Sequence, residues 1–356
     1  MFTIDMLDAA HGDCLWIEYG DPARPKRILI DTGPAATYEK HLLPRIQAVV
    51  DAEGECVFEL FVVTHIDDDH IGASLRLLDE LEPSAVRIKE IWFNGYFHLS
   101  DQVDGLMGPD QGEKLSELIR RGGWPWNRKF GHRAVMVPRE GKLRTFRFAG
   151  MALTVLSPSW EKMQALKKEW EKVIVEEGLV PGKAYAREEP VLGGGFLGDD
   201  VALLAQVPFR EDKTPANGSS IAFLAEYGGK RVLFGADAHP SVLIDSLKRA
   251  PFRGQPQSVE AFKLPHHGSA KNLSVPMLEA FPANRYLVST TGARFRHPDA
   301  EAIARLVVHR AGDDVAICFN CESDHNRDWA GAGRRQQFGY RTEYGAPGEG
   351  LRVAID

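Results

Sequence analysis

One stretch of the sequence places an apolar run directly before a cluster of charged side chains. Residues 60–64 read LFVVT, and residues 65–70 read HIDDDH. Ile71, Leu75 and Leu78 then follow at helical spacing. The pattern predicts a buried strand, then a charged loop, and then an amphipathic helix.

The charged loop favours metal binding. Three carboxylates between two imidazoles would raise one another's pKa values strongly unless positive charge lay among them. One or two divalent metal ions would supply that charge, and histidine and aspartate are common ligands for such ions. The alternative is a solvated acidic turn, in which aspartates cap the free N–H groups of the helix and interact favourably with its dipole. Capping does not require a histidine at each end of the turn.

The composition is that of an ordinary globular protein. Of the 356 residues, 44% are hydrophobic and 26% are charged, and the length allows a sizeable core in one large domain or two smaller ones. No window approaches the roughly 18 consecutive apolar residues of a membrane span, and the N-terminus lacks a basic region followed by an apolar stretch. We therefore expect a soluble, cytoplasmic protein with no membrane partner.

The cysteines predict no disulfide scaffold, because there are only four and they are widely spaced. Cys318 and Cys321 form a single C-x-x-C pair. Without a second pair nearby, two reduced thiols are a better interpretation than a zinc site.

Positive charge is concentrated in one region, although the formal net charge of the chain is −7. Lysines and arginines gather between residues 120 and 150, together with Trp124, Trp126 and Phe130. This mixture suits phosphate contact and base stacking. An equally good interpretation is a solvated hairpin whose arginine stems pack on the aromatic rings.

Several other segments predict parts of the scaffold. Residues 38–50 have a helical pattern that Pro44 would kink or divide, and residues 160–177 predict a long helix. Residues 134–137 predict a strand, and residues 221–234 predict a hairpin with a glycine turn.

Polar residues repeatedly follow the predicted strands. This recurrence predicts one α/β domain whose chemistry gathers at one edge of its sheets. The donors are too many for one tetrahedral metal, whereas two metals about 3.5–4 Å apart, with a bridging carboxylate, would use them all. Besides the charged loop, these residues are Asp31, Asp237, His266, His267 and His297.

The order of the motifs carries a family resemblance. The sequence reads D-x-x-x-G-D at residues 8–13, T-H-x-D-x-D-H-I-G at 64–72, N-x-S-S at 217–220, G-A-D at 235–237, L-P-H-H-G-S at 264–269 and H-P at 297–298. This set resembles the metallo-β-lactamase fold superfamily. Within it, the chain is similar to the soluble metallohydrolase domain of ComEC-type DNA-uptake proteins.

The resemblance implies an α/β fold, an αββα four-layer sandwich with two mixed sheets face to face and helices outside. It extends from residue 1 to about residue 310. We expect a single domain over residues 1–356, with insertions at about 94–132 and 160–215 and a C-terminal extension from about residue 312.

The resemblance also implies a ligand set for two divalent metal ions. One metal would be bound by His65 and Asp67, the other by Asp69 and His70, and Asp237 would bridge them. His266 resembles the late histidine ligand, and His267 is a second candidate for that role or an outer hydrogen-bond donor. Asp31 resembles a carboxylate that orients a ligand histidine. Other residues expected near the metals or the substrate are Asp13, Ser219, Lys271, Arg294 and Arg296.

Two positions depart from the usual pattern of the superfamily. Its usual histidine is replaced by Asp67, as is common in the ComEC branch, and the harder oxygen donor shifts the preference toward Mn²⁺ without excluding Zn²⁺. No mid-chain histidine ligand is identifiable. His98 and His132 lie in the first insertion, and we expect each at the surface.

The leading functional hypothesis is a two-metal-dependent hydrolase, a phosphodiesterase or nuclease in which a metal-bridging hydroxide attacks phosphorus. DNA, RNA or a nucleotide would be the substrate, and a protein partner or homo-oligomer stays open. One alternative is a metallohydrolase of a small ester, such as a phosphocholine-type ester or a lactone. Another is a regulatory subunit with a vestigial site. The residues assigned to catalysis are Asp69, Asn217 and His297. His297 would bind phosphate oxygens with either Asn217 or Lys271.

Overall fold

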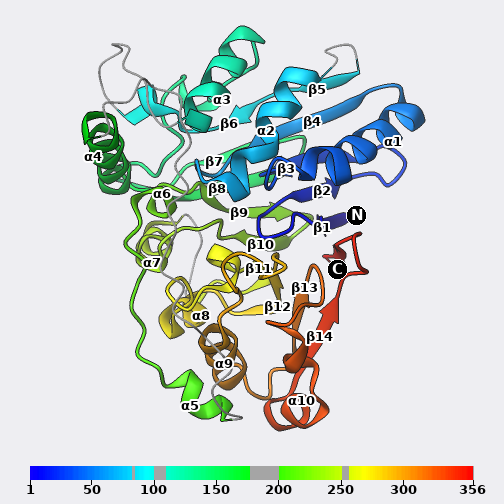
Figure 1. The fold of residues 1–356 in the computed structure, drawn as a ribbon, viewed down its shortest axis with the longest axis vertical. Coiled ribbons are helices and arrows are strands. Elements are labelled where there is room, and N and C mark those ends of the chain that lie inside the picture. The colour runs from blue at the N-terminus through cyan, green and yellow to red at the C-terminus, as the bar shows by residue number, and fades with distance from the viewer. Residues whose placement is uncertain (82–84, 100–109, 177–199, 251–255, 356) are drawn as a thin grey trace.

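Two mixed β-sheets lie face to face in the middle of the protein, and helices cover their outer faces (Figure 1). This arrangement comes from a computed structural model. The structure describes residues 1–81, 85–99, 110–176, 200–250 and 256–355. The predicted α/β fold with two mixed sheets and outer helices is confirmed.

The first sheet has seven strands in the order β15-β1-β2-β3-β4-β5, with β6 also paired to β4. The pairs from β15 to β3 are antiparallel, whereas β4 runs parallel to β3, β5 and β6. The strands are β1 (Phe2–Met6), β2 (Leu15–Tyr19), β3 (Lys26–Ile30), β4 (Cys56–Val62), β5 (Val86–Ile88), β6 (Ile91–Trp92) and β15 (Leu351–Ala354).

The second sheet has eight strands in the order β14-β13-β12-β11-β10-β9-β8-β7. The pairs from β7 to β10 are antiparallel, and those from β10 to β14 are parallel. The strands are β7 (Thr145–Phe148), β8 (Met151–Ser157), β9 (Ala222–Tyr227), β10 (Lys230–Phe234), β11 (Val259–Lys263), β12 (Ala283–Val288), β13 (Val315–Phe319) and β14 (Tyr340–Tyr344).

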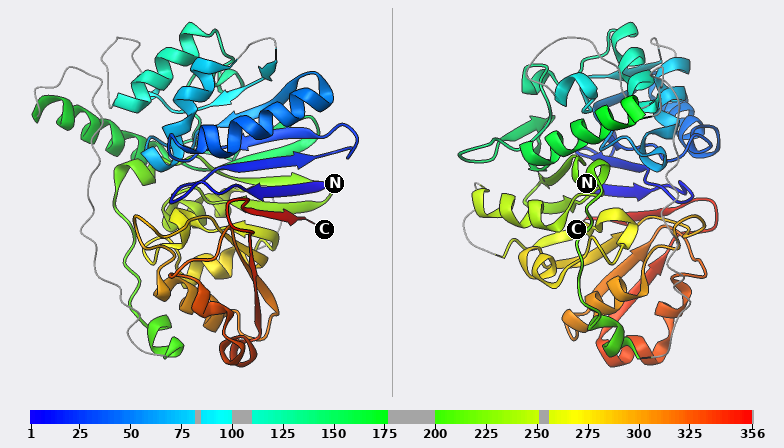
Figure 2. Two further views of the ribbon diagram at one scale, coloured as in Figure 1. Left: turned by 45° about the vertical axis from the view of Figure 1, so that its right-hand side comes forward. Right: turned by 60° about the vertical axis from the view of Figure 1, so that its left-hand side comes forward.

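Helices lie on both outer sides of the pair of sheets, as the rotated views in Figure 2 show. On the first sheet lie α1 (Leu43–Glu53), α2 (Asp68–Glu80) and α3 (Asp110–Arg121). The other α-helices are α4 (Trp160–Glu176), α5 (Val201–Ala205), α6 (Pro215–Gly218), α7 (Pro240–Arg249), α8 (Val275–Ala280), α9 (Ala300–His309) and α10 (Ala332–Phe338). Short helical turns are η1 (Tyr38–Leu42), η2 (Tyr96–Leu99), η3 (Arg128–Phe130), η4 (Pro265–Gly268) and η5 (Arg327–Ala330).

Strand β4 explains the apolar run that precedes the charged loop. Leu60 and Val62 belong to the core between the two sheets, whereas Phe61 and Val63 pack in the layer beneath the helices of the first sheet. A strand that is buried on both faces needs apolar residues at successive positions. The run therefore lacks the alternation of a half-exposed strand.

The helices and the hairpin predicted for the scaffold are present, but one predicted strand is absent. Pro44 lies in the first turn of α1, where the π-helical turn η1 passes into the α-helix, so the helix is divided into two types at this point although its backbone angles stay helical. The strand predicted at residues 134–137 is wrong. The backbone N–H of Val135 donates to the side chain of Asn94, and that of Val137 donates to the Pro158 carbonyl, rather than to a neighbouring strand.

The C-terminal residues from 312 take part in both sheets. They supply β13 and β14 to the second sheet, and β15 pairs with β1 of the first. The segment expected as an extension therefore joins the edges of the two sheets near the N-terminus (Figure 1).

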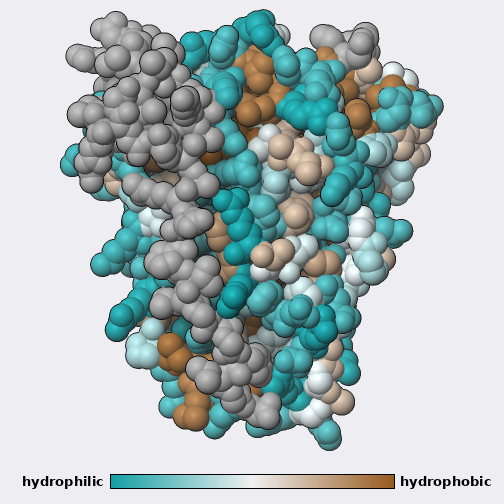
Figure 3. All heavy atoms as spheres, viewed as in Figure 1, coloured by the Kyte–Doolittle hydropathy of each residue, from teal (hydrophilic) through white to brown (hydrophobic). Residues whose placement is uncertain are grey.

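The basic stretch between residues 120 and 150 is not a single hairpin, because it runs from the end of α3 through η3 to β7, but charged side chains pack on aromatic rings there as the alternative interpretation expects. Trp126 and Phe130 are buried, so their rings are not available to stack on bases. Charged groups lie over aromatic rings instead: the Arg120 guanidinium is 5.2 Å from the centre of the Phe97 ring, and the Lys129 ammonium is 4.9 Å from the Phe148 ring. The face of the molecule in Figure 3 is largely hydrophilic, with apolar residues in small groups.

Two smaller expectations have clear outcomes. All four cysteines are free and buried, which agrees with reduced thiols. Within the described residues, the structure contains no helix with the length and apolar character needed to cross a membrane.

An aromatic cluster joins the two sheets and predicts a large stability effect. Trp92 is fully buried and makes edge contacts with Phe130, Phe146, Phe148 and Phe223. We expect Trp92→Ala to lower the free energy of unfolding by about 3–5 kcal/mol because it leaves a cavity between the sheets.

Urea unfolding followed by circular dichroism would measure this loss. The matched control is Leu203→Ala, whose side chain is 63% exposed, and which should change the free energy of unfolding by less than about 0.5 kcal/mol. Equal effects of the two substitutions would contradict the prediction.

Candidate metal centre

The charged loop follows β4, its last three residues form the start of α2, and its first aspartate does not act as a cap. Asp67 is the N-cap residue of α2, but its side chain accepts no hydrogen bond from the helix. Its Oδ2 lies 3.5 Å from Nε2 of His65, and the side chain is 42% exposed. This arrangement disfavours the capping interpretation for Asp67 and leaves its carboxylate available for another interaction.

Asp31 holds the loop in place from the end of β3. Its Oδ1 accepts a hydrogen bond from the backbone N–H of Thr64 at 2.7 Å, and its Oδ2 accepts one from the Thr64 hydroxyl at 2.8 Å. The same Oδ2 lies 2.8 Å from Nδ1 of His70. One buried carboxylate thus connects β3, the segment after β4, and the first turn of α2.

These hydrogen bonds assign the protons on two imidazoles. His70 donates its Nδ1–H to Asp31, because a carboxylate accepts only. The single proton of the Thr64 hydroxyl goes to Asp31, so the hydroxyl oxygen accepts the Nδ1–H of His65 at 3.0 Å. When either ring is neutral, its lone pair is therefore on Nε2, which is the form that binds a metal.

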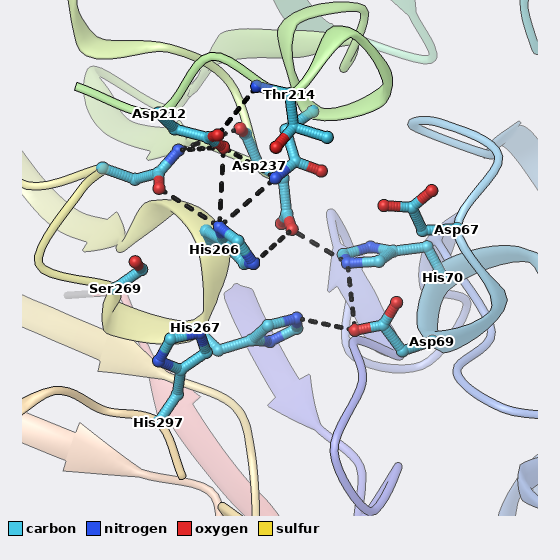
Figure 4. A network of polar contacts seen from close by, with 12 residues as sticks. Asp67, Asp69, His70, Asp212, Thr214, Asp237, His266, His267, Ser269 and His297 are labelled. Carbon is cyan, nitrogen blue, oxygen red and sulfur yellow. Dashed lines mark hydrogen bonds and ion pairs between the residues drawn. The ribbon is translucent and has the colours of Figure 1, made fainter. Parts of the chain in front are cut away.

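Asp237 lies just after β10, between the two imidazoles. Its Oδ1 is 3.3 Å from Nε2 of His70, and its Oδ2 is 3.9 Å from Nε2 of His65. The same Oδ2 is 3.8 Å from Nε2 of His266 (Figure 4). The two oxygens of one buried carboxylate therefore face different groups of nitrogens.

His266 and His267 lie in the turn η4 after β11. Both have left-handed backbone conformations, with φ values of 48° and 53°, which cost about 1–2 kcal/mol for each residue other than glycine. Their rings point to different neighbours: His266 faces Asp237, and Nε2 of His267 lies 3.2 Å from Oδ2 of Asp69 (Figure 4). Nδ1 of His267 donates to the Ser289 carbonyl at 2.8 Å.

The electrostatics of the centre are dominated by carboxylates. Burial alone would lower the pKa of His70, but Asp237, Asp31 and Asp69 raise it well above its usual value. Burial would raise the pKa of Asp237, but neighbouring imidazoles, first His70 and then His266, hold it well below its usual value. The buried carboxylates thus favour a positive charge among them, whether on imidazoles or on a metal ion.

A divalent cation fits the polar atoms at the centre. Nε2 of His65, Nε2 of His70 and Oδ1 of Asp237 are buried without a hydrogen-bond partner in the described part of the chain, and such atoms are rare and costly. Their residues form one group that could hold a metal. A second group is Asp69, His70 and His267, and in each group the ligand atoms lie within 4.8 Å of one another.

A third such group, Asp13, Asp31 and His70, already has its charges balanced. The carboxylate of Asp13 pairs with the buried ammonium of Lys263 at 2.6 Å, and that of Asp31 is used by Thr64 and His70. Burial raises the pKa of Asp13, but Lys263, His267 and His70 together hold it well below its usual range. Asp13 also lies 3.4 Å from Nδ1 of His267, so it supports that ring.

Two of the residues assigned to catalysis reach the centre from the side of His266. Asn217 lies in α6, and its Nδ2 is 3.3 Å from Nδ1 of His266. The ring of His297 is centred 5.1 Å from that of His266, and its Nδ1 lies 3.0 Å from Oδ1 of Asp299. Both side chains therefore border the group of nitrogens around Asp237.

The remaining predicted residues lie further from the centre. The Ser219 hydroxyl donates to the Ala216 carbonyl at 2.6 Å and so serves its own turn. Lys271 and Arg296 are exposed. Nη1 of Arg294 lies 3.4 Å from Nε2 of His11 and 3.9 Å from Oδ2 of Asp68, which places its guanidinium beside the charged loop.

Two residues near His266 carry no sequence signal. Asp212 is buried and accepts a hydrogen bond from Asn217 at 2.7 Å, and Asn272 lies 3.1 Å from Nδ1 of His266 through its Oδ1. Asp212 lies in a loop-like stretch without periodicity, and Asn272 follows the H-H-G-S motif rather than a strand. Neither position stands out from an ordinary turn residue.

Neither histidine of the first insertion supplies the mid-chain ligand. His98 was expected at the surface, and this is wrong: it is buried, its ring is centred 4.8 Å from that of Trp126, and burial lowers its pKa to about 3. His132 is exposed, as expected. Among the described residues, neither belongs to a group that could hold a metal.

A comparison with protein-family models agrees with the fold. The family model described as the metallo-beta-lactamase superfamily matches residues 11–292. Zn²⁺-bound PqqB from Methylobacterium extorquens is a similar solved structure, with 13% identity, coverage of 100% of both chains and a TM-score of 0.42. No match is found among curated proteins.

Two further structures are similar at the same level. A diphosphatase from the PhnP family has 11% identity, coverage of 100% of this chain and 98% of that chain, and a TM-score of 0.39. CmlA, a diiron β-hydroxylase from Streptomyces venezuelae, has 13% identity and a TM-score of 0.39, and the match covers 99% of this chain and 53% of CmlA.

The position of Asp31 predicts a strong effect of Asp31→Asn on metal affinity. The amide NH₂ in place of Oδ2 would face Nδ1 of His70 and favour the tautomer with the proton on Nε2. We expect the affinity of the apoprotein for Zn²⁺ or Mn²⁺ to fall by about 10–100-fold, as is typical when a partner that orients a ligand is lost.

Competition with a chromophoric chelator would measure this affinity. Asp51→Asn is the matched control. Asp51 is an exposed residue of α1, and its carboxylate accepts a hydrogen bond from the side chain of Gln47. Unchanged affinity in the Asp31 variant would show that Asp31 does not act on the metal centre.

Proposed function

This chain belongs to the metallo-beta-lactamase superfamily, whose members are mostly metal-dependent hydrolases, and from this premise we propose that it is a two-metal-dependent phosphodiesterase. The observation that carries the proposal is the position of Asp237, whose two oxygens face different groups of imidazoles. The motifs identified the superfamily correctly, while the similarity to ComEC-type proteins stays a prediction.

Two sets of side chains would hold the metals. His65 and Asp67 lie toward Oδ2 of Asp237, and Asp69 and His70 lie toward Oδ1. A histidine of the pair at 266–267 would complete the ligands. Bound in this way, two divalent cations would neutralise the charge that develops on a phosphoryl group and lower the pKa of an attacking water. Zn²⁺ and Mn²⁺ both suit the nitrogen and carboxylate donors.

Cationic groups near the centre support a phosphate substrate. Arg294 and Arg296 are exposed on the loop that leads to His297, and Nη1 of Arg294 lies beside the charged loop. A phosphodiester is anionic before and during the reaction, so these guanidinium groups would bind its non-bridging oxygens. His297 and Asn217 would add hydrogen-bond donors from the side of His266.

The same loop disfavours the phosphocholine alternative. A quaternary ammonium group is usually bound over aromatic ring faces. The guanidinium of Arg294 lies over the Phe295 ring, 5.1 Å from its centre, and would repel such a cation. The lactone alternative and the regulatory subunit with a vestigial site stay untested.

A polynucleotide would be bound chiefly through its phosphates. Trp126 and Phe130 of the basic stretch are buried and Trp124 is half-buried, so base stacking there gives little support to a nuclease. DNA, RNA and small nucleotides therefore stay equally good substrates within the proposal, and electrostatic contact with the backbone would be salt-dependent.

Metal rescue tests the proposal directly. We expect apoprotein to regain cleavage of bis-p-nitrophenyl phosphate when two equivalents of Mn²⁺ or Zn²⁺ are added, and Asp237→Asn to lower kcat by about 100-fold or more, equivalent to about 2.7 kcal/mol. Asp245→Asn is the control, because Asp245 is an exposed residue of α7. A protein that binds no metal, and in which His65→Ala changes nothing, would falsify the proposal.

The arginines on the substrate loop predict selectivity for phosphodiesters. We expect the double substitution Arg294→Ala and Arg296→Ala to raise KM for a dinucleotide by about 10-fold, because two charge-assisted contacts are lost, and to leave hydrolysis of an uncharged lactone unchanged. The salt dependence of polynucleotide cleavage should weaken in the same variant.

Steady-state kinetics at several salt concentrations would measure both effects. Arg341→Ala is the matched control, because Arg341 lies on β14, is exposed and pairs with Asp314. A lactonase would show the opposite preference, with lactone turnover far above phosphodiester turnover in the unmodified protein.

A further inference from the structure

We infer that the adjacent histidines of η4 bind different metals, with His266 joining His65 and His267 joining His70. His266 would thereby take the place of the mid-chain histidine that the described part of the chain does not supply. The inference rests on the proposed two-metal centre and specifies which side chain serves which metal.

The position of His266 relates it to the metal of His65. Its Nε2 lies 3.8 Å from Oδ2 of Asp237, and Nε2 of His65 lies 3.9 Å from the same oxygen. Oδ2 of Asp67 is 3.5 Å from Nε2 of His65. Ligands at about 2.0–2.1 Å from zinc in a tetrahedral site lie roughly 3.3 Å apart, so small adjustments would bring these four atoms to one metal.

The position of His267 relates it to the other metal. Its Nε2 lies 3.2 Å from Oδ2 of Asp69, and that oxygen is 4.0 Å from Nε2 of His70. Nε2 of His70 is in turn 3.3 Å from Oδ1 of Asp237. Each metal would then have two imidazoles, one aspartate of the charged loop and one oxygen of Asp237.

The backbone of η4 makes this division possible. Residues 266–268 all have positive φ values, and the two histidine rings are centred 6.0 Å apart with an interplanar angle of 68°. A shared metal would need both Nε2 atoms to converge. Instead, His266 faces Oδ2 of Asp237, and His267 faces Asp69 (Figure 4).

Separate partners hold the two rings with Nε2 available for a metal. The amide of Asn272 is oriented by its NH₂ group, which donates to the Asp237 carbonyl at 3.2 Å and lies 3.4 Å from Asp212. Its Oδ1 therefore accepts the Nδ1–H of His266 at 3.1 Å. Nδ1 of His267 donates to the Ser289 carbonyl. Asn272 and Asp212 are thus positioning residues for His266.

Metal stoichiometry in pairs of substitutions tests the division. Elemental analysis of the Zn²⁺-loaded protein, and electronic spectra of the Co²⁺-loaded protein, should show two equivalents in the unmodified chain and one in His266→Ala. The double variant with His65→Ala and His266→Ala should still hold one equivalent, because both residues serve the same metal. The double variant with His70→Ala and His266→Ala should hold none.

His267 gives the reciprocal result. His267→Ala combined with His70→Ala should keep one equivalent, and combined with His65→Ala it should keep none. The affinity for the metal that is lost should fall by more than the 10–100-fold that loss of an outer hydrogen-bond partner produces. His309→Ala, an exposed residue of α9, is the control and should keep two equivalents. Circular dichroism would establish that each variant is folded.

The outcomes separate the inference from the proposed function. If His266→Ala binds two metal equivalents with unchanged affinity and His267→Ala binds one, then His267 alone is the late ligand. That result would overturn the inference. Loss of both equivalents in a folded single variant would also overturn it. Fewer than two equivalents in the unmodified chain would overturn the two-metal proposal itself.

Discussion

The carboxylate of Asp31 is the interaction on which the arrangement of the centre depends. It accepts hydrogen bonds from the backbone and the hydroxyl of Thr64 and from Nδ1 of His70. Through Thr64 it also determines the proton position on His65. A single buried acceptor therefore joins β3, β4 and α2 and directs the Nε2 atoms of two imidazoles toward Asp237. Without the Asp31 carboxylate, the sequence of the charged loop alone would not determine which imidazole nitrogens could bind a metal.

Backbone strain accumulates where the strands of both sheets deliver polar side chains to the centre. Asp31 follows β3, Ala236 precedes Asp237 after β10, and His266 and His267 follow β11, and all four have positive φ values. Such conformations persist only where surrounding contacts hold them, and they concentrate at functional sites. Here they turn the chain sharply at the strand ends, so that side chains from two sheets meet. The buried Asp13–Lys263 pair balances one further negative charge beside them.

The sequence predicted those features that depend on periodicity or on strand ends. The apolar run of β4 and the division of a helix at Pro44 follow from local rules. The strand expected at residues 134–137 fails because burial alone produces the same apolar pattern: Val135 is buried, but its N–H is satisfied by the side chain of Asn94. The aromatic rings near residue 126 could not be placed, because composition does not tell whether a ring faces solvent or core.

The pair of adjacent histidines shows why ligand assignment needs backbone geometry. In a strand, neighbouring side chains point to opposite faces, which would leave only one of the two rings at the centre and favour a single late ligand. The left-handed turn at η4 changes this, because both rings stay on the side of Asp237 while diverging toward different carboxylates. On the proposed assignment, the missing mid-chain histidine is then no sign of a vestigial site, since a second histidine from the same turn completes the ligand count.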